Sequence, residues 1–394
     1  MKVLIYVDKK QLRPIGGPAG YLYNLSIGLK KIYNTDIHFL NENESKESKN
    51  TPKSIIKRLI PKKILTKVQY VRYIKKALYS DGKEAKINFD DYDAIHFHAV
   101  ADLYRNRELL KKYKGKIILT SHTPEAPYLE AYDYMKSLNL SDKFIQNSVE
   151  KLKEIDRYAF ENCTDLIFPC KDATEPYMHT STFFRENYNE FISKISYLPT
   201  GVNRPDSIQS PVLPSNIDRN KFMVCYVGRH NKIKGYDLLK KAAKKIQNID
   251  KDIQFLIAGK EEPLHSDASL NNWYEFGWTN NPLGIEKMSN LFVLPNRETY
   301  FDLALIEALS VPSILLISNT GGNKYFKRFN SNSINFFESE NVNDLVNKIL
   351  YIKNNYSNYD KNKSREIYEH YFTPEIFAKN YVKTIEKIVK EKVQ

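Results

Sequence analysis

Short apolar runs alternate with longer stretches of helical periodicity along the whole chain, and this alternation limits the fold more than any other feature. It is typical of a mostly parallel α/β sheet. In the first half we expect strands at residues 3–7, 37–40, 94–98, 117–120, 166–169 and 195–198. We expect helices there at residues 20–33, 64–79, 102–113 and 144–162.

The second half repeats this plan without a visible sequence repeat. We expect strands at residues 223–227, 254–258, 291–294 and 313–317, and helices at 237–247, 303–310 and 343–354. Residues 199–214 hold four prolines and show little periodicity, which marks the position of an interdomain linker. Two doubly wound parallel-sheet domains joined in this way leave a cleft between the carboxyl ends of their strands, where such sheets bind ligands.

Composition narrows the class of protein and of partner. The 394 residues suit two domains, and the three cysteines form no CxxC pair, which fits a reduced compartment and excludes a disulfide scaffold or a Cys-rich zinc site. No apolar run approaches the roughly 20 residues of a membrane span, and the run Met1–Asp8 is too short for a signal peptide, so we expect a cytoplasmic protein. The net charge of +13 suggests an acidic partner: nucleic acid, an anionic membrane or a phosphorylated ligand.

A glycine pair, Gly16 and Gly17, lies between the first expected strand and the first expected helix. Glycines let the backbone approach a ligand closely, and the helix start that follows offers free N–H groups to a phosphate. The pair is not the GxGxxG of dinucleotide-binding proteins, and an ordinary strand-to-helix turn is the alternative interpretation.

A second motif follows the first expected strand of the second half. That strand runs into Gly228 and Arg229, and Lys234 and Gly235 precede the next helix. Arg229 and Lys234 leave the carboxyl end of a strand together and could clamp a diphosphate, the Arg as a planar fork and the Lys as a point charge. Two solvated cations in a basic protein are the alternative.

A third motif joins a strand, a loop and a helix over residues 294–310. The loop amides of Phe301 to Leu303 are expected to face the cleft, with Glu307 in the helix that follows. A carboxylate there can accept hydrogen bonds from paired ribose hydroxyls. The alternative is an exposed helix residue, but the helix is apolar almost all round Glu307, and a lone carboxylate in such a helix needs a partner.

These three motifs, in this order, resemble those of the retaining glycosyltransferases of family 4, which have the GT-B fold. The resemblance covers nearly the whole chain. It includes the strand at 95–98, the Leu-Pro-Thr-Gly-Val at 198–202 and the late Gly321-Gly322. It implies an acceptor-side domain over residues 1–199, a linker over 200–219, a nucleotide-sugar-binding domain over 220–375, and a helix over 376–394 that packs back towards the amino-terminal domain.

The resemblance also implies roles for single residues. Arg229 and Lys234 would bind the donor diphosphate, and Glu307 would hold the ribose. A His of the amino-terminal domain would lie near the donor sugar, and the best match is His122, which follows the expected strand 117–120. A solvated loop residue is the other interpretation of His122.

The loop before Glu307 departs from the family pattern, which has a first Glu, seven residues, and then the second Glu. Counting back from Glu307 places Thr299 on the first Glu and Asp302 on a Gly, while Glu298 is one residue early. The first Glu orients donor-sugar hydroxyls, and this role falls to Glu298 through a one-residue bulge, to Thr299 or to Asp302. Asp302 is alternatively a helix N-cap. The predicted donor-binding loop comprises Thr299, Tyr300, Phe301, Asp302 and Leu303, with Glu298 as a candidate catalytic residue.

Two pairs of residues imitate metal sites. Asp91 and Asp93 match a DxD motif, but they precede a strand and so lie at the wrong end of the sheet for a ligand. His96 and His98 lie two apart on one face of a strand without a third ligand nearby, which favours packing or cleft lining. We predict no metal ligand.

Residues 53–79 contain nine Lys and Arg and no Asp or Glu. After Pro61 the apolar residues Ile64, Val68, Val71, Ile74 and Leu78 follow a helical period. A basic amphipathic helix can lie on an anionic membrane, whereas a core-docked helix with a solvated basic face is the alternative. Nucleic-acid binding is not expected, because no known nucleic-acid module accompanies the segment.

We therefore expect a retaining, metal-independent glycosyltransferase of hexosyl or N-acetylhexosaminyl type, without a cofactor. It would move a sugar from a nucleotide-diphosphate sugar, with UDP-sugars favoured, to a hydroxyl of a glycan, lipid-linked or protein acceptor in cell-surface glycan, glycolipid or glycoprotein synthesis. A peripheral position on the inner face of the cell membrane fits this role. The alternatives are a non-catalytic GT-B subunit that binds or chaperones an active transferase, and a nucleotide-sugar epimerase, for which the sequence offers no acid/base set.

Overall fold

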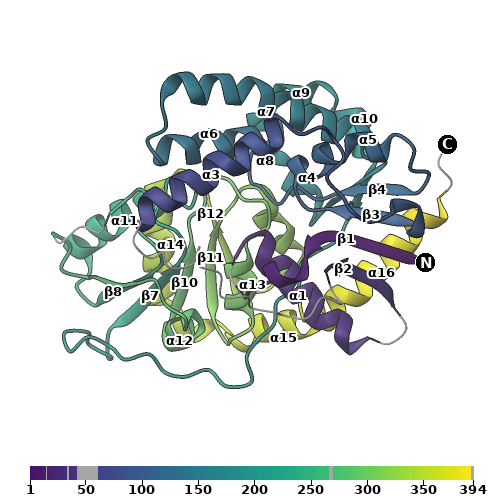
Figure 1. Cartoon of the computed structure of the whole chain (residues 1–394). Helices are drawn as coiled ribbons and strands as arrows, with labels where there is room; N and C mark the ends of the chain where they lie inside the picture. Colours follow the sequence, from purple (N-terminus) through teal and green to yellow (C-terminus); the bar gives the residue numbers. More distant parts are fainter. Residues whose placement is uncertain (15, 33–34, 42–60, 266–268, 392–394) are drawn as a thin grey trace.

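Each half of the molecule has one six-stranded parallel sheet at its centre (Figure 1). The computed structural model describes residues 1–14, 16–32, 35–41, 61–265 and 269–391. The first sheet has the strand order β2-β1-β3-β4-β5-β6, and the second has the order β12-β11-β10-β7-β8-β9. The two doubly wound parallel sheets expected from the sequence are therefore confirmed.

The strands of the first sheet are β1 (Lys2–Asp8), β2 (Asp36–Leu40), β3 (Ala94–Phe97), β4 (Lys116–Leu119), β5 (Asp165–Phe168) and β6 (Ile195–Tyr197). Those of the second are β7 (Phe222–Val227), β8 (Ile253–Ala258), β9 (Trp273–Gly277), β10 (Leu291–Leu294), β11 (Ile314–Ser318) and β12 (Ile334–Phe337). All ten expected strands are present, and their ends agree within one residue.

The helices lie on the faces of the sheets. Those of the first half are α1 (Pro18–Lys31), α3 (Lys62–Leu78), α4 (Val100–Arg105), α5 (Arg107–Leu110), α6 (Pro127–Ser137), α7 (Asp142–Asn162), α8 (Glu175–Thr180), α9 (Thr182–Glu186) and α10 (Tyr188–Ser193). The later ones are α11 (Tyr236–Ile249), α12 (Pro282–Met288), α13 (Leu303–Leu309), α14 (Val342–Asn354), α15 (Asn362–Tyr371) and α16 (Pro374–Lys390). Short 3₁₀ segments include η2 (Phe89–Asp91), η3 (Lys171–Thr174) and η4 (Gly321–Phe329).

The two strands that the sequence did not reveal, β9 and β12, are the outermost strands of the second sheet. Each is only partly buried and carries a polar residue, Glu275 in β9 and Asn335 in β12. A strand with one neighbour faces solvent along part of its length, so it lacks the continuous apolar run of a central parallel strand.

The helix expected over residues 102–113 was wrong as a single element. The chain forms α4 and α5 instead, with a break at Asn106. The Asn106 side chain donates to the carbonyl oxygen of Asp102 and accepts from the N–H of Ala85, both at 2.8 Å. An Asn that satisfies nearby backbone groups in this way competes with regular helix hydrogen bonding.

The last helix, α16, returns to the first half and packs against α1 (Figure 1). Gly28 of α1 lies so close to α16 that a Cβ atom there would be 2.0 Å from the carbonyl oxygen of Pro374. Phe377, Tyr381 and Ile385 of α16 share one buried cluster with residues of α1 and β1. The carboxyl-terminal helix thus covers the amino-terminal sheet and ties the two halves together.

The helix α3 packs against α4 and α7. Ile74, Ala77 and Leu78 are buried, but Ile64 and Val68 of the expected apolar stripe are 53% and 41% exposed. The first part of the basic segment, residues 53–60, lies outside the described residues. No helix in the described part of the chain is long and apolar enough to cross a membrane.

Candidate active site

The second and third sequence motifs form one surface, because the strands that lead into them are neighbours. β7 and β10 pair in parallel, so the loops after their carboxyl ends lie side by side. Arg297 donates its N–H to the carbonyl oxygen of Ile233 at 2.8 Å, which joins the two loops. Gly235 has a φ of +66°, and a Cβ atom there would lie 1.7 Å from the carbonyl oxygen of Pro295. Only glycine fits this contact.

Arg297 holds this pair of loops through its side chain as well. Its guanidinium donates to both carboxylate oxygens of Asp237 at 2.7 and 2.9 Å, and it lies 2.7 Å from Glu340. Hydrogen bonding to Asp237 raises the pKa of Arg297, with the Asp237 charge adding to the effect. The sequence indicates no role for Arg297, because its partners belong to other loops and no spacing predicts that pairing.

Arg229 and Lys234 emerge from the first of these loops in different environments. Arg229 is exposed, and its charge acts on Glu125 and Glu130 of the first half. Burial raises the pKa of Glu125 to about 7, with further increases from neighbouring carboxylates, while Arg229 opposes them. Arg229 therefore faces an acidic part of the opposite half. Lys234 is partly buried, and its ammonium is ion-paired with Asp302.

Asp302 caps the helix α13, as one of its two sequence interpretations expected. Its Oδ1 accepts from the N–H of Ala304 at 3.3 Å, and its Oδ2 accepts from Asn296 at 3.0 Å and from Lys234. The Ala304 amide at the helix start is thus occupied by a carboxylate. The backbone amides of Phe301 to Leu303, which were expected to face the cleft, thus lie next to the capping carboxylate. The Phe301 side chain is buried against Phe326.

The other two candidates for the first Glu of the motif lie elsewhere. Glu298 accepts from Nδ1 of His179, a residue of α8, at 2.8 Å. Thr299 is buried, and its carbonyl oxygen accepts from the N–H of Gly322 at 3.0 Å. Of the three, only Asp302 contacts Lys234, which is predicted to bind the diphosphate. Glu298 lies at the contact between the two halves.

That contact between the halves involves two further pairs. Lys324 of η4 is ion-paired with Glu175 of α8. The Tyr300 hydroxyl donates to the carbonyl oxygen of Ile167, a residue of β5, at 3.3 Å. The predicted donor-binding loop therefore contacts the first sheet directly.

Glu307 lies in α13 between fully buried apolar neighbours, as the sequence predicted. Burial raises its pKa to about 7, and the charge of Asp302 adds to the increase. A second carboxyl group, Glu286 of α12, is only 1% exposed, and its pKa is raised well above the usual range by burial and then by Glu307. The sequence does not single out Glu286, because its place beside Glu307 depends on how α12 packs against β7 and α13.

His122 follows β4 and has a φ of +62°, a conformation that side chains other than glycine rarely adopt. Its Nε2 lies 2.8 Å from Nδ1 of His98, which follows the neighbouring strand β3. The Tyr21 ring of α1 packs against His122 with centroids 4.6 Å apart. Burial lowers the pKa of His122 to about 3. His122 thus lies in a cluster with His98 and Tyr21. Because Tyr21 is in the first turn of α1, the glycines that precede α1 lie near this cluster.

The glycine pair before α1 faces open space. Gly17 is the N-cap of α1 with a φ of +76°, and a Cβ atom on Gly16 or Gly17 would meet nothing within 4 Å. Positive φ accounts for glycine at position 17. Room for a ligand against this backbone is therefore present.

The two imitations of metal sites have other partners. Asp93 accepts from the backbone N–H of Lys2 at 2.7 Å, at the amino end of the strands. His96 is fully buried between the Tyr381 hydroxyl at 3.0 Å and the Thr120 hydroxyl at 2.9 Å. Across the described residues, no group of three or more His, Cys, Asp or Glu side chains is placed to hold a metal ion.

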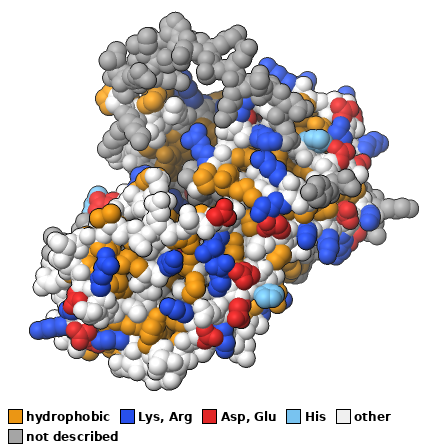
Figure 2. Space-filling model, turned by 90° about the horizontal axis from the view of Figure 1, so that it is seen from below, with side chains coloured by type: hydrophobic (Ala, Val, Ile, Leu, Met, Phe, Trp, Pro, Cys, Tyr) orange, Lys and Arg blue, Asp and Glu red, His pale blue; other side chains and the backbone are white. Residues whose placement is uncertain are grey.

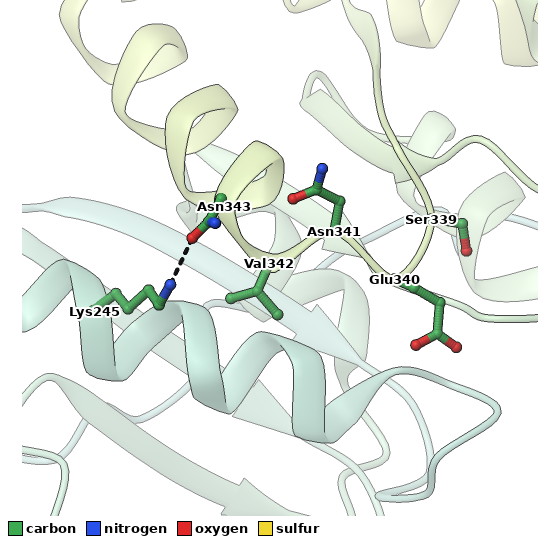
Figure 3. Close-up of a pocket in the computed structure, with 6 residues that line it drawn as sticks. All are labelled: Lys245, Ser339, Glu340, Asn341, Val342 and Asn343. Carbon is green, nitrogen blue, oxygen red and sulfur yellow. Dashed lines mark hydrogen bonds between the residues drawn. The ribbon is translucent and has the colours of Figure 1, made fainter.

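A surface hollow of about 490 Å³ lies between α11 and α14 (Figure 3). It is lined by Lys245, Ser339, Glu340, Asn341, Val342 and Asn343, and Lys245 donates to Asn343 across it at 2.5 Å. None of these residues belongs to the predicted motifs. On the face seen in Figure 2, Lys and Arg side chains are mixed with Asp and Glu, so this face is not a single basic surface.

Comparison with known proteins agrees with the geometry of the second half. Residues 213–370 match the family model described as glycosyl transferases group 1. The UDP-Gal:alpha-D-GlcNAc-diphosphoundecaprenol alpha-1,3-galactosyltransferase of Escherichia coli is 32% identical over 150 residues, which are 33% of this chain and 38% of that protein. The match thus spans well under half the length of this relative.

Solved structures resemble the chain over nearly its whole length. Sucrose-phosphate synthase from Thermosynechococcus elongatus has a TM-score of 0.64 at 17% identity, covering 98% of this chain and 99% of that one. Anabaena Alr3699/HepE in complex with UDP-glucose has a TM-score of 0.60 at 12% identity, covering 98% of this chain and 100% of that one. Residues 213–370 therefore match the group 1 glycosyltransferase family, and the two parallel sheets of the chain have the GT-B-like fold.

Proposed function

We propose that this chain is a retaining glycosyltransferase that moves a sugar from a UDP-sugar to a hydroxyl group of a glycan or lipid-linked acceptor. One observation carries the proposal: Arg229 and Lys234 lie in the loop after β7, and Glu307 lies in α13, the helix that follows the loop after the neighbouring strand β10. The name of the Escherichia coli relative includes UDP-Gal and a diphosphoundecaprenol-linked sugar, and HepE was solved with UDP-glucose. These names support UDP as the nucleotide and a lipid-linked acceptor.

The two cations suit a leaving diphosphate. When the bond between the anomeric carbon and the diphosphate oxygen breaks, negative charge collects on that oxygen. The Arg229 fork and the Lys234 ammonium would stabilise this charge, which is electrostatic catalysis by groups already in place. Glu307 would accept hydrogen bonds from the ribose hydroxyls and so fix the nucleotide at the same edge of the sheet.

Retention of configuration fits attack on the face that the diphosphate leaves. The acceptor oxygen bonds to the anomeric carbon, and its proton passes to the departing diphosphate oxygen. This route needs no protein base, and the motifs supply none at the predicted position. His122, neutral because burial lowers its pKa, would hydrogen-bond the donor sugar rather than carry charge.

The two cations also make a metal ion unnecessary for neutralising the diphosphate. We expect transfer to continue in excess chelator. Activity that is lost in chelator and restored only by a divalent ion would contradict this part of the proposal.

A rival function is favoured by one observation, the ion pair of Lys234 with Asp302. A non-catalytic subunit that binds an active transferase would have no need of a free Lys234. The partly buried Glu307 and the exposed Arg229 favour the enzyme, because a binding subunit has no use for either.

The test is a screen of UDP-, GDP- and ADP-sugars for thermal stabilisation and for sugar transfer or hydrolysis. A donor at 100 times its dissociation constant should stabilise the fold by about 2.7 kcal/mol. Arg229→Ala should abolish the effect, whereas Asp250→Asn, which alters an ion pair with Lys353 elsewhere in the same half, should leave it intact. If no nucleotide sugar stabilises the wild type, the chain is not a glycosyltransferase and the subunit function replaces it.

A further inference from the structure

Lys234, the cation expected to bind the donor diphosphate, already has an anionic partner in this chain. Its ammonium is paired with Oδ2 of Asp302, and the two side chains are 22% and 11% exposed. The pair joins the loop after β7 to the loop after β10 at the position where the two phosphate-binding motifs meet.

Capping of α13 does not account for this arrangement. The cap uses Oδ1 of Asp302, which accepts from the N–H of Ala304 at 3.3 Å. The other oxygen, Oδ2, is directed at Lys234 and at the Asn296 amide, 3.0 Å away. A capping residue needs one oxygen, and Asn or Ser would serve as well as Asp. The negative charge of Asp302 therefore serves the ion pair with Lys234 and not the helix cap.

The carboxylate stays charged despite its burial. Burial alone would raise the pKa of Asp302, but the Lys234 charge and the hydrogen bonds from Lys234, Asn296 and the Ala304 N–H outweigh it, so the pKa is lowered. The neutral form of Asp302, which would not compete with a diphosphate for Lys234, is thus disfavoured. A diphosphate that binds Lys234 has to compete with a permanent negative charge.

We propose that Asp302 is an internal occupant of the diphosphate subsite, which a donor displaces from Lys234 when it binds. Asp302 thereby lowers the affinity of the free enzyme for any diphosphate and makes Lys234 available only to ligands that also gain contacts elsewhere, at Arg229 and Glu307. The inference rests on the proposed function for the identity of the ligand. It assigns Asp302 as a residue that sets donor affinity and selectivity, not as a catalytic residue.

The most informative variant is Asp302→Asn. The substituted side chain keeps an oxygen for the Ala304 N–H and loses the charge. Asn296 has a buried side-chain oxygen without a partner, and rotation of its amide would let that oxygen accept from the amide that the substitution introduces. The variant is therefore expected to fold, and its melting temperature checks this directly.

Binding of UDP and of inorganic pyrophosphate is measured by calorimetry for the wild type, Asp302→Asn, Lys234→Ala and the double variant. We expect Asp302→Asn to bind both ligands about tenfold more tightly, the change that removal of one adjacent negative charge can supply in a partly buried site. This gain should vanish in the Lys234→Ala background, because the two residues act through each other. Asp250→Asn, which removes a carboxylate from a similarly exposed Lys–Asp pair, should not tighten binding.

The outcomes separate this inference from the proposed function. If wild type and Asp302→Asn bind UDP equally, or the variant binds more weakly, Asp302 does not compete at Lys234 and the inference is wrong, while UDP binding still supports the function. If pyrophosphate binds more tightly to Asp302→Asn but UDP binds neither protein, the inference stands and UDP as the donor nucleotide is wrong. If the gain persists without Lys234, the carboxylate acts elsewhere and the assignment to Lys234 is overturned.

Discussion

Nδ1 of His98 lies 2.8 Å from Nε2 of His122, across the ends of the neighbouring strands β3 and β4. Burial lowers the pKa of His98 well below its usual range and that of His122 to about 3, so both rings are neutral near pH 7. A hydrogen bond between two neutral imidazoles uses one protonated and one bare nitrogen. The pair leaves Nδ1 of His122 for a substrate, because the other unused ring nitrogen, Nε2 of His98, is buried.

We predict that His98→Leu lowers kcat by about 10- to 100-fold, the range for losing a residue that orients a functional imidazole. KM for the donor should change less, because His98 contacts His122 and not the loops proposed to bind the nucleotide. His98→Asn, whose amide can still hydrogen-bond to His122, should recover part of the activity. Steady-state kinetics on the three proteins gives the comparison.

The matched control is the double variant His98→Leu/His122→Ala. If His98 acts only through His122, the double variant is no slower than His122→Ala alone. Independent, additive losses would show that His98 has a separate role in folding or binding.

Gly235→Ala should separate the loop after β7 from the loop after β10. Its φ of +66° strains any side chain, and its Cβ atom would overlap the Pro295 carbonyl at 1.7 Å. We expect a loss of about 3 kcal/mol in unfolding free energy and of UDP binding. Gly277→Ala shares the positive φ, +63°, but has open space around it, so it should cost about 1 kcal/mol and isolate the strain. Similar losses in urea unfolding for the two variants would contradict the close contact.

Much of this site could be predicted because it follows strand ends. The order of strands and loops placed Arg229 and Lys234 after one strand and Glu307 in the helix after another, and the structure makes those two strands, β7 and β10, neighbours. The apolar neighbours of Glu307 correctly indicated burial, since 3.6-residue periodicity is local information.

Contacts between loops could not be predicted in the same way. The pairs Lys234 with Asp302 and Arg297 with Asp237 span about 60 residues or more, and each depends on which strands are neighbours. Spacing along the chain does not encode that order. The same reason hid His98 as the partner of His122, although both were singled out separately.

Arg229→Ala and Lys234→Ala should differ in stability while both impair catalysis. Each should cost about 2–4 kcal/mol of transition-state stabilisation, as for loss of a charge-stabilising donor. Arg229 is exposed, so its removal should leave the melting temperature unchanged. Removal of Lys234 leaves Asp302 charged and unpaired, which should destabilise the fold by about 2 kcal/mol after allowance for partial exposure.

Thermal unfolding of Lys234→Ala with and without Asp302→Asn checks the origin of that loss. The second substitution removes the unpaired charge and should restore most of the stability. Equal melting temperatures for the two would show that Lys234 contributes packing rather than charge.

The raised pKa of Glu307 predicts opposite pH trends for the stability of the fold and for donor binding. Burial, and then Asp302, raise the pKa of Glu307 from an ordinary 4.5 to about 7. The acid form is thus favoured in the free protein, and its stabilising contribution, complete below pH 4.5, is lost as pH rises through 7. Ribose hydroxyls need the carboxylate as acceptor. The affinity for UDP-glucose should therefore rise about tenfold between pH 6 and pH 8.

Titration calorimetry with UDP-glucose over this range tests the trend, since its diphosphate has no proton to gain there. Glu307→Gln should bind weakly and without pH dependence. Two other carboxyls with raised pKa values, Glu286 and Glu125, remain in that variant, so a persisting pH trend would assign the titration to them and not to Glu307.

The outer side of α3 combines apolar and basic residues, which suits a peripheral contact with an anionic membrane. Ile64, Val68, Arg72 and Lys75 are exposed at spacings that place them along one side of the helix, while Ile74, Ala77 and Leu78 are buried beneath it. Lys76 differs, because it pairs with Glu84. The surface of α3 formed by residues 64, 68, 72 and 75 is therefore the part available to lipid.

We predict that wild-type protein sediments with vesicles containing anionic lipid and that the association weakens with salt. Each cation near the surface contributes about 1 kcal/mol, and the attraction fades beyond roughly 8–10 Å. Arg72→Gln/Lys75→Gln should reduce binding through charge, and Ile64→Ser/Val68→Ser through loss of apolar insertion. Lys76→Gln is the matched control, since its charge is already paired within the protein. Equal sedimentation of all four proteins, or indifference to anionic lipid and salt, would mean that α3 presents only a solvated face, and support for a lipid-linked acceptor would then rest on the relative alone.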